Sequence, residues 1–379
     1  MTFILANKKI LIFSEGFGTG HTQAAHALSV ILEQQSDEIT TNVVELGTRL
    51  HPLLAPLFFS AYKKTVSLQP RLYNKLYRSQ HRKTLNRFSQ LALHKLFYAQ
   101  TMQIINDMMP DMIVCTHPFP SLVISRLKRS GLKIPLFTII TDYDAHGAWV
   151  SREVNKYFVS TINVKEKLIQ HGIHSSFIDV TGIPIHPSFQ HIYNLDEARL
   201  QFGLKSMPTV LVMGGGWGIL GNTDLYMQMI RWSDYIQFIF CLGNNTKTLK
   251  KMSDDPNFQH ENIKLLGYTK EIGKLMDISD LLVTKPGGMT CTEGMTKGIP
   301  MLFYDTISGQ EEENLSYFIN QGLGEKIHSV QTIEIWFSRL VENYSYFQER
   351  KKNIHHKNKE FNRTNCSETI FNTLNSFAT

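Results

Sequence analysis

Two patterns of hydrophobic and polar positions alternate along the chain. Short apolar runs, such as residues 9–14, are followed by longer stretches with helical spacing, such as residues 21–33. Short runs of this kind predict buried strands, and the longer stretches predict helices. The expected strands are residues 9–14, 39–46, 112–115, 134–141, 209–213, 236–241, 263–266, 281–284 and 301–304. Strands that alternate with helices favour parallel sheets with helices on both faces.

The strand and helix alternation occurs in two series, so we predict an α/β chain with two doubly wound, Rossmann-like domains. Between the series, Pro184 and Pro187 disfavour helix and favour an extended connector. The expected division is a first domain (1–184), a second domain (185–355) and a C-terminal helical segment (356–379) that could pack back on the first domain. Ligands of such sheets bind beyond the carboxyl ends of the strands, which predicts a site in an interdomain cleft.

The first glycine-rich loop separates the first predicted strand from the first predicted helix. Gly16, Gly18 and Gly20 are followed by His21. The glycines and the helix N-terminus could approach a phosphate, although a bare turn is the alternative. His21 replaces the third glycine of a dinucleotide fingerprint, and no phosphate-loop lysine follows. An imidazole there could take a proton from a hydroxyl; otherwise His21 is a capping or packing residue.

Two further glycine-rich loops lie in the second half of the chain. Gly215, Gly216 and Gly218 belong to a loop with four glycines in five positions, which a turn alone hardly explains. This pattern favours contact with phosphate.

The third loop gives the strongest signal. It comprises Pro286, Gly287, Gly288, Met289, Thr290 and Glu293. A helix that starts near Met289 could neutralise a diphosphate without a metal ion, and Glu293 could accept hydrogen bonds from ribose hydroxyls. Gln310 and Glu311 open another helix and suit sugar hydroxyls, while an acid-rich turn stabilised by the helix dipole is the alternative.

Residues 46–106 contain ten Lys or Arg and no Asp or Glu. The whole chain carries a formal charge of only +6, so the remaining residues sum to 10 fewer charges, which is −4. Cations interleaved with aromatic residues suit an anionic membrane surface; a solvated helical face is the alternative. No nucleic-acid-binding module accompanies them, so we expect no nucleic acid partner. The residues predicted to meet such a surface are Phe58, Phe59, Lys63, Lys64, Arg71, Arg78 and Arg82.

Composition narrows the class of protein further. The chain has 379 residues, 42% of them hydrophobic, which fits two globular domains. The four cysteines form no paired motif, so we expect no zinc site, no disulfide framework and a reducing, cytoplasmic setting. Residues 1–6 are too short to act as a secretory signal, and no apolar run approaches the roughly 18 residues of a membrane span.

These motifs together resemble a known family. The loop that ends in Gly20-His21, the segment Thr141-Asp142-Tyr143 and the motif Lys285-Pro286-Gly287-Gly288 occur in the same order in the processive diacylglycerol β-glucosyltransferases of Gram-positive bacteria. His146, Trp149, Thr181–Pro184 and Gly309-Gln310-Glu311 extend the likeness. The plant monogalactosyldiacylglycerol synthases are similar, and the lipid II-forming N-acetylglucosaminyltransferases more distantly so. Thr19, Tyr143 and Asp144 depart from the family pattern.

The resemblance implies a GT-B fold of glycosyltransferase family 28 and metal-independent transfer with inversion, with no cofactor beyond the UDP-sugar substrate. The domain 1–184 would bind the acceptor and the membrane, through Trp149 and the seven residues predicted above, and the domain 185–355 would bind the UDP-sugar. By position, Gly215 and Gly218 would flank the diphosphate and Gly287, Gly288 and Met289 would hold it. Glu293 would bind ribose, Tyr268 the uracil, and Gln310 and Glu311 the donor sugar. His21 would be the general base, with Asp142 either orienting it or acting as the base itself.

We therefore predict a hexosyltransferase that moves glucose from a UDP-sugar to diacylglycerol, and again to the glycolipid product, on the inner face of the cell membrane. A transferase with another sugar or a soluble acceptor is the first alternative. A UDP-sugar sensor without activity is the second, although a pure binding module has no need of a placed base.

Overall fold

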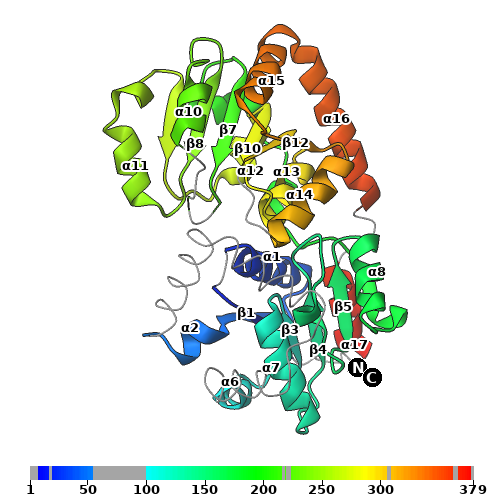
Figure 1. Cartoon of the computed structure of the whole chain (residues 1–379). Coiled ribbons are helices and arrows are strands. Elements are labelled where there is room, and N and C mark those ends of the chain that lie inside the picture. The colour runs from blue at the N-terminus through cyan, green and yellow to red at the C-terminus, as the bar shows by residue number, and fades with distance from the viewer. Residues whose placement is uncertain are drawn as a thin grey trace. The chain divides into compact units, whose positions relative to one another are not determined.

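The computed structural model describes residues 7–16, 19–53, 100–215, 218, 223–304, 309–361 and 366–376. They fall into two compact units. The first consists of Met1–Pro187, Ile307–Gln310 and Phe361–Thr379, and the second of Ser188–Thr306 and Glu311–Glu360. Each unit contains a six-stranded sheet (Figure 1). All neighbouring strands run parallel, which confirms the predicted class of two doubly wound α/β sheets.

The first unit is built on the sheet β2-β1-β3-β4-β5-β6. Its strands are β1 (Lys8–Ser14), β2 (Ile39–Glu45), β3 (Met112–Cys115), β4 (Leu136–Ile139), β5 (Lys156–Val159) and β6 (Ile178–Val180). Its helices are α1 (Thr19–Gln35), α2 (Leu46–Leu50), α6 (Thr101–Met108), α7 (Pro118–Arg129), α8 (Ile162–Gln170) and α17 (Cys366–Ser376). Short 3₁₀ turns are η1 (Gly147–Trp149), η2 (Ser175–Phe177) and η3 (Pro187–Phe189), which runs into the second unit.

The strand β1 is apolar on both faces because helices cover both faces of the first sheet. Ile10 and Ile12 pack in one cluster with residues of α1, whereas Leu11 and Phe13 pack in another. The C-terminal helix α17 belongs to the first of these clusters through Cys366, Ile370 and Leu374. The amide of Gln35 at the end of α1 also donates to the hydroxyl of Ser367 (3.0 Å). The chain thus ends against the first unit (Figure 1).

The second unit has the sheet order β12-β11-β10-β7-β8-β9. When the strands are numbered within this unit and read from β9, the order is 3-2-1-4-5-6. The strands are β7 (Thr209–Met213), β8 (Gln237–Cys241), β9 (Ile263–Leu266), β10 (Leu281–Thr284), β11 (Met301–Phe303) and β12 (Gly324–Lys326). The helices are α9 (Leu195–Gln201), α10 (Thr223–Ile230), α11 (Thr246–Ser253), α12 (Ile272–Asp277), α13 (Gly288–Thr296), α14 (Gln310–Asn320), α15 (Val330–Glu342) and α16 (Tyr344–Phe361), with the 3₁₀ turn η4 (Pro256–Phe258).

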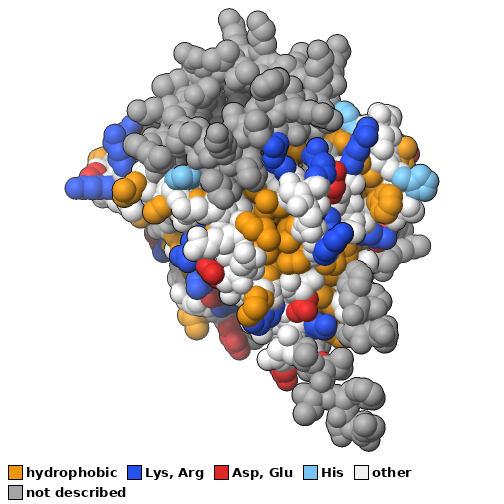
Figure 2. Space-filling view, turned by 90° about the horizontal axis from the view of Figure 1, so that it is seen from below, with side chains coloured by type: hydrophobic (Ala, Val, Ile, Leu, Met, Phe, Trp, Pro, Cys, Tyr) orange, Lys and Arg blue, Asp and Glu red, His pale blue; other side chains and the backbone are white. Residues whose placement is uncertain are grey.

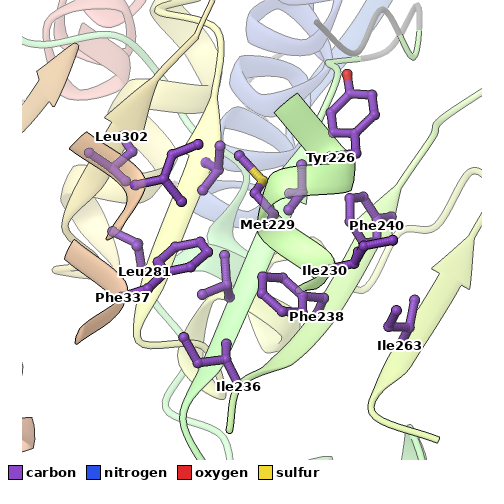
Figure 3. Packing of buried hydrophobic residues seen from close by; sticks show 14 of the residues in the cluster. Tyr226, Met229, Ile230, Ile236, Phe238, Phe240, Ile263, Leu281, Leu302 and Phe337 are labelled. Atoms are coloured by element: carbon purple, nitrogen blue, oxygen red, sulfur yellow. The ribbon is translucent and has the colours of Figure 1, made fainter. Parts of the chain in front are cut away.

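One face of the second sheet carries a large apolar core. Figure 3 shows Phe238 and Phe240 of β8 together with Met229 of α10 and Phe337 of α15, which pack against one another. Their side chains are at most 1% exposed. The core holds the strands in place and thereby fixes the points at which the loops at their carboxyl ends begin.

The structure adds three strands that we did not predict from the sequence. They are β5, β6 and β12, each at or next to the edge of its sheet. β6 and β12 have only three residues each, and the sequence of β12 is Gly-Glu-Lys. Such runs are too short or too polar to give a strand pattern, and pairing with a neighbouring strand decides their conformation.

Candidate active site

Each sheet reverses its winding at one point, and several of the candidate site residues lie there. In the first sheet this point lies between β1 and β3, and in the second between β7 and β10. Ligands of open α/β sheets bind beyond the carboxyl ends of the strands at such a point. His21 follows β1, and Thr116 follows β3; the glycine loop from Gly214 follows β7, and Lys285 follows β10. We call the two groups of residues the first and the second half-site.

His21 in the first turn of α1 is held by residues that follow two other strands. Its Nδ1 lies 3.0 Å from the carbonyl oxygen of Thr116 and 2.6 Å from the hydroxyl of Thr141. A carbonyl oxygen can only accept, so Nδ1 carries the proton. The neutral ring then has its lone pair on Nε2, which is the arrangement that a general base requires.

The surroundings of His21 also keep its ring neutral. Burial lowers the pKa of His21 from 6.5 to about 4, although the hydrogen bond to the Thr116 carbonyl acts in the opposite direction. His21 is therefore uncharged at neutral pH and able to accept a proton from a hydroxyl.

Two further histidines, His117 and His146, lie in the neighbourhood of His21. The ring of His117 meets that of His21 edge to face, with 4.6 Å between the ring centroids. Nδ1 of His117 accepts from the Phe119 N–H (3.2 Å) and caps α7, and Nδ1 of His146 accepts from the Ala148 N–H (3.3 Å). Burial, and then the nearby His21 and His146, hold the pKa of His117 well below its ordinary value. We did not predict His117; the available signal was its place two residues after the buried strand β3.

Trp149 needs a correction. We expected it on the acceptor or membrane side, but it is 1% exposed and belongs to the core of the first unit. Its ring lies beside those of His21 (6.1 Å between centroids) and His146 (6.4 Å). Trp149 thus packs beside the histidines, and its buried ring does not face a membrane; a contact with the acceptor stays a prediction.

Asp142 and Asp144 follow β4, close in sequence to the Thr141 that contacts His21. Both carboxylates are buried, at 4% and 1% exposure. Asp144 forms an ion pair with Lys167 of α8, so this departure from the family pattern is a structural pair within the first unit. The role of Asp142 stays a prediction. Gly20 is the second residue of α1.

Some predicted residues lie outside the part of the chain that the structure describes. They are Gly18 and Gly216 of the glycine loops and the whole predicted membrane group apart from Trp149, namely Phe58, Phe59, Lys63, Lys64, Arg71, Arg78 and Arg82.

The second half-site centres on the N-terminus of α13. Gly287 precedes this helix with φ −74° and ψ 135°, and its carbonyl accepts the first helical hydrogen bond, from the Cys291 N–H (3.0 Å). The N–H groups of Gly288, Met289 and Thr290 lie before that bond, in the turn where a helix offers donors and positive charge. A Cβ on Gly287 would meet nothing within 4 Å, so neither its conformation nor its packing requires glycine. A ligand could approach this backbone closely.

Hydrogen bonds join the loops of the second half-site. Thr284 pairs in register with Met213 and with Phe303, so the loops after β7, β10 and β11 start side by side. The Tyr304 hydroxyl donates to the Met213 carbonyl (2.7 Å), and the Asn314 amide of α14 donates to the Pro286 carbonyl (3.1 Å). These contacts fix the edge that carries the predicted donor residues.

The glycine loop after β7 has a conformational reason for two of its glycines. Gly215 and Gly218 have φ of +68° and +56°, which other residues rarely adopt. A Cβ on Gly218 would lie only 1.8 Å from the Leu242 carbonyl oxygen. The turn itself therefore explains these two glycines, and contact with a diphosphate stays a prediction for them.

The remaining predicted donor residues differ in their environment. Glu293 lies within α13, and burial raises the pKa of its carboxyl to about 8. Glu311 is paired with Lys285, with 3.1 Å between Nζ and Oε1. Gln310 is the first residue of α14. Tyr268 follows β9 and is 58% exposed, which leaves its ring accessible to a base.

Neither a metal cluster nor a membrane span is found in the described ranges. No group of three or more His, Cys, Asp or Glu side chains there is arranged to hold a metal ion. No helix there combines the length and the apolar character needed to cross a bilayer.

Two Rossmann-like sheets of parallel strands, one in each unit, place the chain in the GT-B fold class. Residues 21–185 match the model of the monogalactosyldiacylglycerol (MGDG) synthases, and residues 209–370 match that of the glycosyltransferase family 28 C-terminal domain. The chain belongs to this family and is a family 28 glycosyltransferase related to the diacylglycerol glucosyltransferases. Our predictions of the family and of an enzyme are confirmed.

Known proteins agree with this assignment. The processive diacylglycerol β-glucosyltransferase of Bacillus subtilis is 30% identical over 366 residues, which cover 96% of this chain and 94% of that protein. The UDP-GlcNAc 2-epimerase of Neisseria meningitidis, solved with UDP-GlcNAc, superposes with a TM-score of 0.61 at 17% identity, covering 97% of this chain and 100% of the other. MurG of Acinetobacter baumannii gives 0.59 at 14% identity, covering 97% and 99%. The two structures confirm the GT-B fold.

Proposed function

We propose that this enzyme transfers a hexose, with glucose as the first candidate, from a UDP-sugar to diacylglycerol and again to the glycolipid product. The Bacillus subtilis relative carries this activity in its name and matches nearly the whole chain. UDP-GlcNAc bound to the structural neighbour from Neisseria meningitidis supports a UDP-sugar as the donor. We further propose that transfer inverts the anomeric carbon and needs no metal ion.

The observation that carries the proposal is the fixed tautomer of His21. The Thr116 carbonyl holds the proton on Nδ1, so Nε2 is the basic atom. In the proposed reaction Nε2 takes the proton of the acceptor hydroxyl while the acceptor oxygen attacks the anomeric carbon. The bond to UDP breaks on the opposite face, so a single displacement inverts the configuration. A sensor without activity would have no use for this arrangement.

The N-terminus of α13 would stabilise the departing UDP. The N–H groups of Gly288, Met289 and Thr290 and the positive end of the helix dipole suit a diphosphate. Glu293 would bind the ribose, Tyr268 the uracil, and Gln310 and Glu311 the sugar. Because these fixed dipoles need no reorganisation as negative charge develops, they could replace a divalent cation.

A membrane acceptor is supported by the charge distribution of the sequence and by the surface. The ten cations of residues 46–106 lie mainly outside the described residues. On the described face in Figure 2, hydrophobic side chains gather in a patch with Lys and Arg side chains, and some Asp and Glu side chains, around it. Such a surface suits the headgroup region of an anionic leaflet. We propose that the enzyme works from the cytoplasm as a peripheral protein of the inner membrane face.

The proposal is tested by incubating the enzyme with diacylglycerol vesicles and UDP-glucose, UDP-galactose or UDP-GlcNAc and analysing the lipids by mass spectrometry. We expect hexosyl-diacylglycerol and, with time, dihexosyl-diacylglycerol from UDP-glucose. Transfer of the sugar to a soluble alcohol, with release of UDP and without any glycolipid, would contradict a lipid acceptor. Binding of UDP-sugar without turnover on any acceptor would favour a sensor.

A further inference from the structure

The ion pair between Lys285 and Glu311 joins the two elements that would hold the donor. Lys285 is the first residue after β10 and precedes the Pro286-Gly287-Gly288 turn, whereas Glu311 is the second residue of α14. We propose that Lys285 is a positioning residue, which holds the carboxylate of Glu311 in the orientation that contacts the donor sugar. The inference rests on the proposed function, because it concerns the same donor site.

The geometry of the pair is specific. Lys285 Nζ lies 3.1 Å from Glu311 Oε1, and the two side chains are only 14% and 16% exposed. Limited access to water weakens screening, so the pair is stronger here than an exposed pair would be. One oxygen of the carboxylate is fixed by the ammonium group. The plane of Glu311 is thereby restrained, and a carboxylate that distinguishes sugar hydroxyls must have a defined orientation.

A second contact links the same two elements. Asn314, one turn after Glu311 in α14, is 1% exposed and donates to the Pro286 carbonyl (3.1 Å). The loop that leads into α13 and the first turn of α14 are therefore joined at two points. The buried hydrogen bond from the Asn314 amide holds the backbone of the loop, and the ion pair holds the Glu311 side chain that would contact the sugar.

Electrostatics gives the lysine a second reason to be there. Three glutamates, Glu311, Glu312 and Glu313, occupy the first turn of α14. A diphosphate at the start of α13 would add negative charge to the same edge of the sheet. Without a cation, the Glu311 carboxylate would be repelled by this negative charge and would turn away from it. Lys285 offsets this charge and keeps Glu311 in place.

The test is a double-mutant cycle with Lys285→Met and Glu311→Gln. The readouts are kcat/KM for UDP-glucose on diacylglycerol vesicles and the inhibition constant of UDP. We expect Lys285→Met to lower kcat/KM about tenfold and to change the UDP inhibition constant less than about threefold. The double variant should be no worse than Glu311→Gln within about threefold, because Lys285 acts through Glu311. Lys285→Arg should recover part of the lost activity.

Lys274→Met serves as the control, because Lys274 also pairs with a glutamate of the second unit, Glu271 (2.6 Å). Its kcat/KM should stay within about twofold of the wild type. The inference is overturned if the losses of the two single variants multiply, if Lys285→Met has no effect, or if it weakens UDP as strongly as UDP-glucose. Thermal unfolding shows whether Lys285→Met folds; if it does not, Lys285→Gln, which also removes the charge, gives the same comparison. A wild-type enzyme that uses none of the UDP-hexoses would instead reject the proposed function.

Discussion

His21 shows how neighbouring residues decide which atom of a side chain can react. The Thr116 carbonyl and the Thr141 hydroxyl come from loops after β3 and β4, about a hundred residues away in the sequence, yet both reach Nδ1. Nε2 is left as the basic atom, and burial keeps the ring neutral. His21→Ala should lower kcat by about 10²- to 10⁴-fold and leave UDP binding nearly unchanged. If Asp142→Asn is inactive and His21→Ala is not, Asp142 is the base.

The lowered pKa of His21 predicts a specific dependence on pH. The folded protein keeps His21 neutral down to about pH 4, whereas the unfolded chain binds this proton near 6.5. The unfolded state therefore binds more protons between these values, and stability falls as the pH falls from 6.5 towards 4. Thermal unfolding between pH 4 and 7 measures this slope, which should be smaller in His21→Asn. An unchanged slope in that variant would show that His21 is not buried in its neutral form.

Glu293 is expected to change the stability of the fold with pH in the opposite direction to His21. Burial raises the pKa of its carboxyl from 4.5 to about 8, so the folded state holds the proton more strongly and stability falls as the pH rises through this range. Glu293→Gln removes the cost of ionisation. We expect a gain on the order of 1 kcal/mol at pH 8, or about 2–4 °C in Tm, and no gain at pH 4. The affinity for UDP should fall if Glu293 binds the ribose. Equal Tm values at pH 8 would contradict the raised pKa.

Among the loops of the second sheet, the one after β7 contains a glycine that the fold requires, Gly218. The loop before α13 contains a glycine that the fold does not require, Gly287, and which suits contact with a ligand. Gly287 has an ordinary φ and open space at its Cβ position, whereas a Cβ on Gly218 would collide with the Leu242 carbonyl. Gly287→Ala should fold with an unchanged or slightly higher Tm but lose about tenfold in UDP affinity. Gly218→Ala should unfold at a lower temperature. Calorimetry measures the UDP affinity and a thermal melt measures the Tm of each variant. Normal UDP affinity in Gly287→Ala would show that UDP does not approach the backbone at this position.

Most of the strands could be predicted because burial on both faces leaves a plain apolar run. Met112–Cys115, Thr209–Met213 and Leu281–Thr284 have the predicted bounds, and all their residues are buried. The strands β6 and β12 could not be predicted, because each has only three residues, of which only the first is buried. Parallel pairing with β5 and with β11 gives them their conformation.

The site was predictable only where a residue stands next to a strand and a glycine loop. His21 and the Gly287 turn carry such local signals in the sequence. The partners that complete them do not, because Thr116, Thr141 and Asn314 become important only when the sheet brings their loops together. The roles of the donor residues stay predictions until UDP binding is measured.

At the scale of the whole molecule, the uneven charge predicts how the enzyme meets its acceptor. Residues 46–106 carry ten cations and no acid. Vesicles with anionic lipid should bind the protein more tightly than neutral ones, and binding should weaken with salt. Replacing Lys63 and Lys64 by serine should weaken binding about thirtyfold, since each cation contributes on the order of 1 kcal/mol. The pair Lys250 and Lys251 on α11 is the control; an equal loss there would point to overall charge.

The central claim is that fixed backbone groups, rather than a divalent cation, neutralise the UDP that leaves during transfer to a lipid. The most direct measurement is the rate of hexosyl-diacylglycerol formation from UDP-glucose and diacylglycerol vesicles in excess EDTA, with mass spectrometry of the product. We expect the same rate with EDTA as with added magnesium or manganese. A rate that disappears in EDTA and returns with either metal would contradict it.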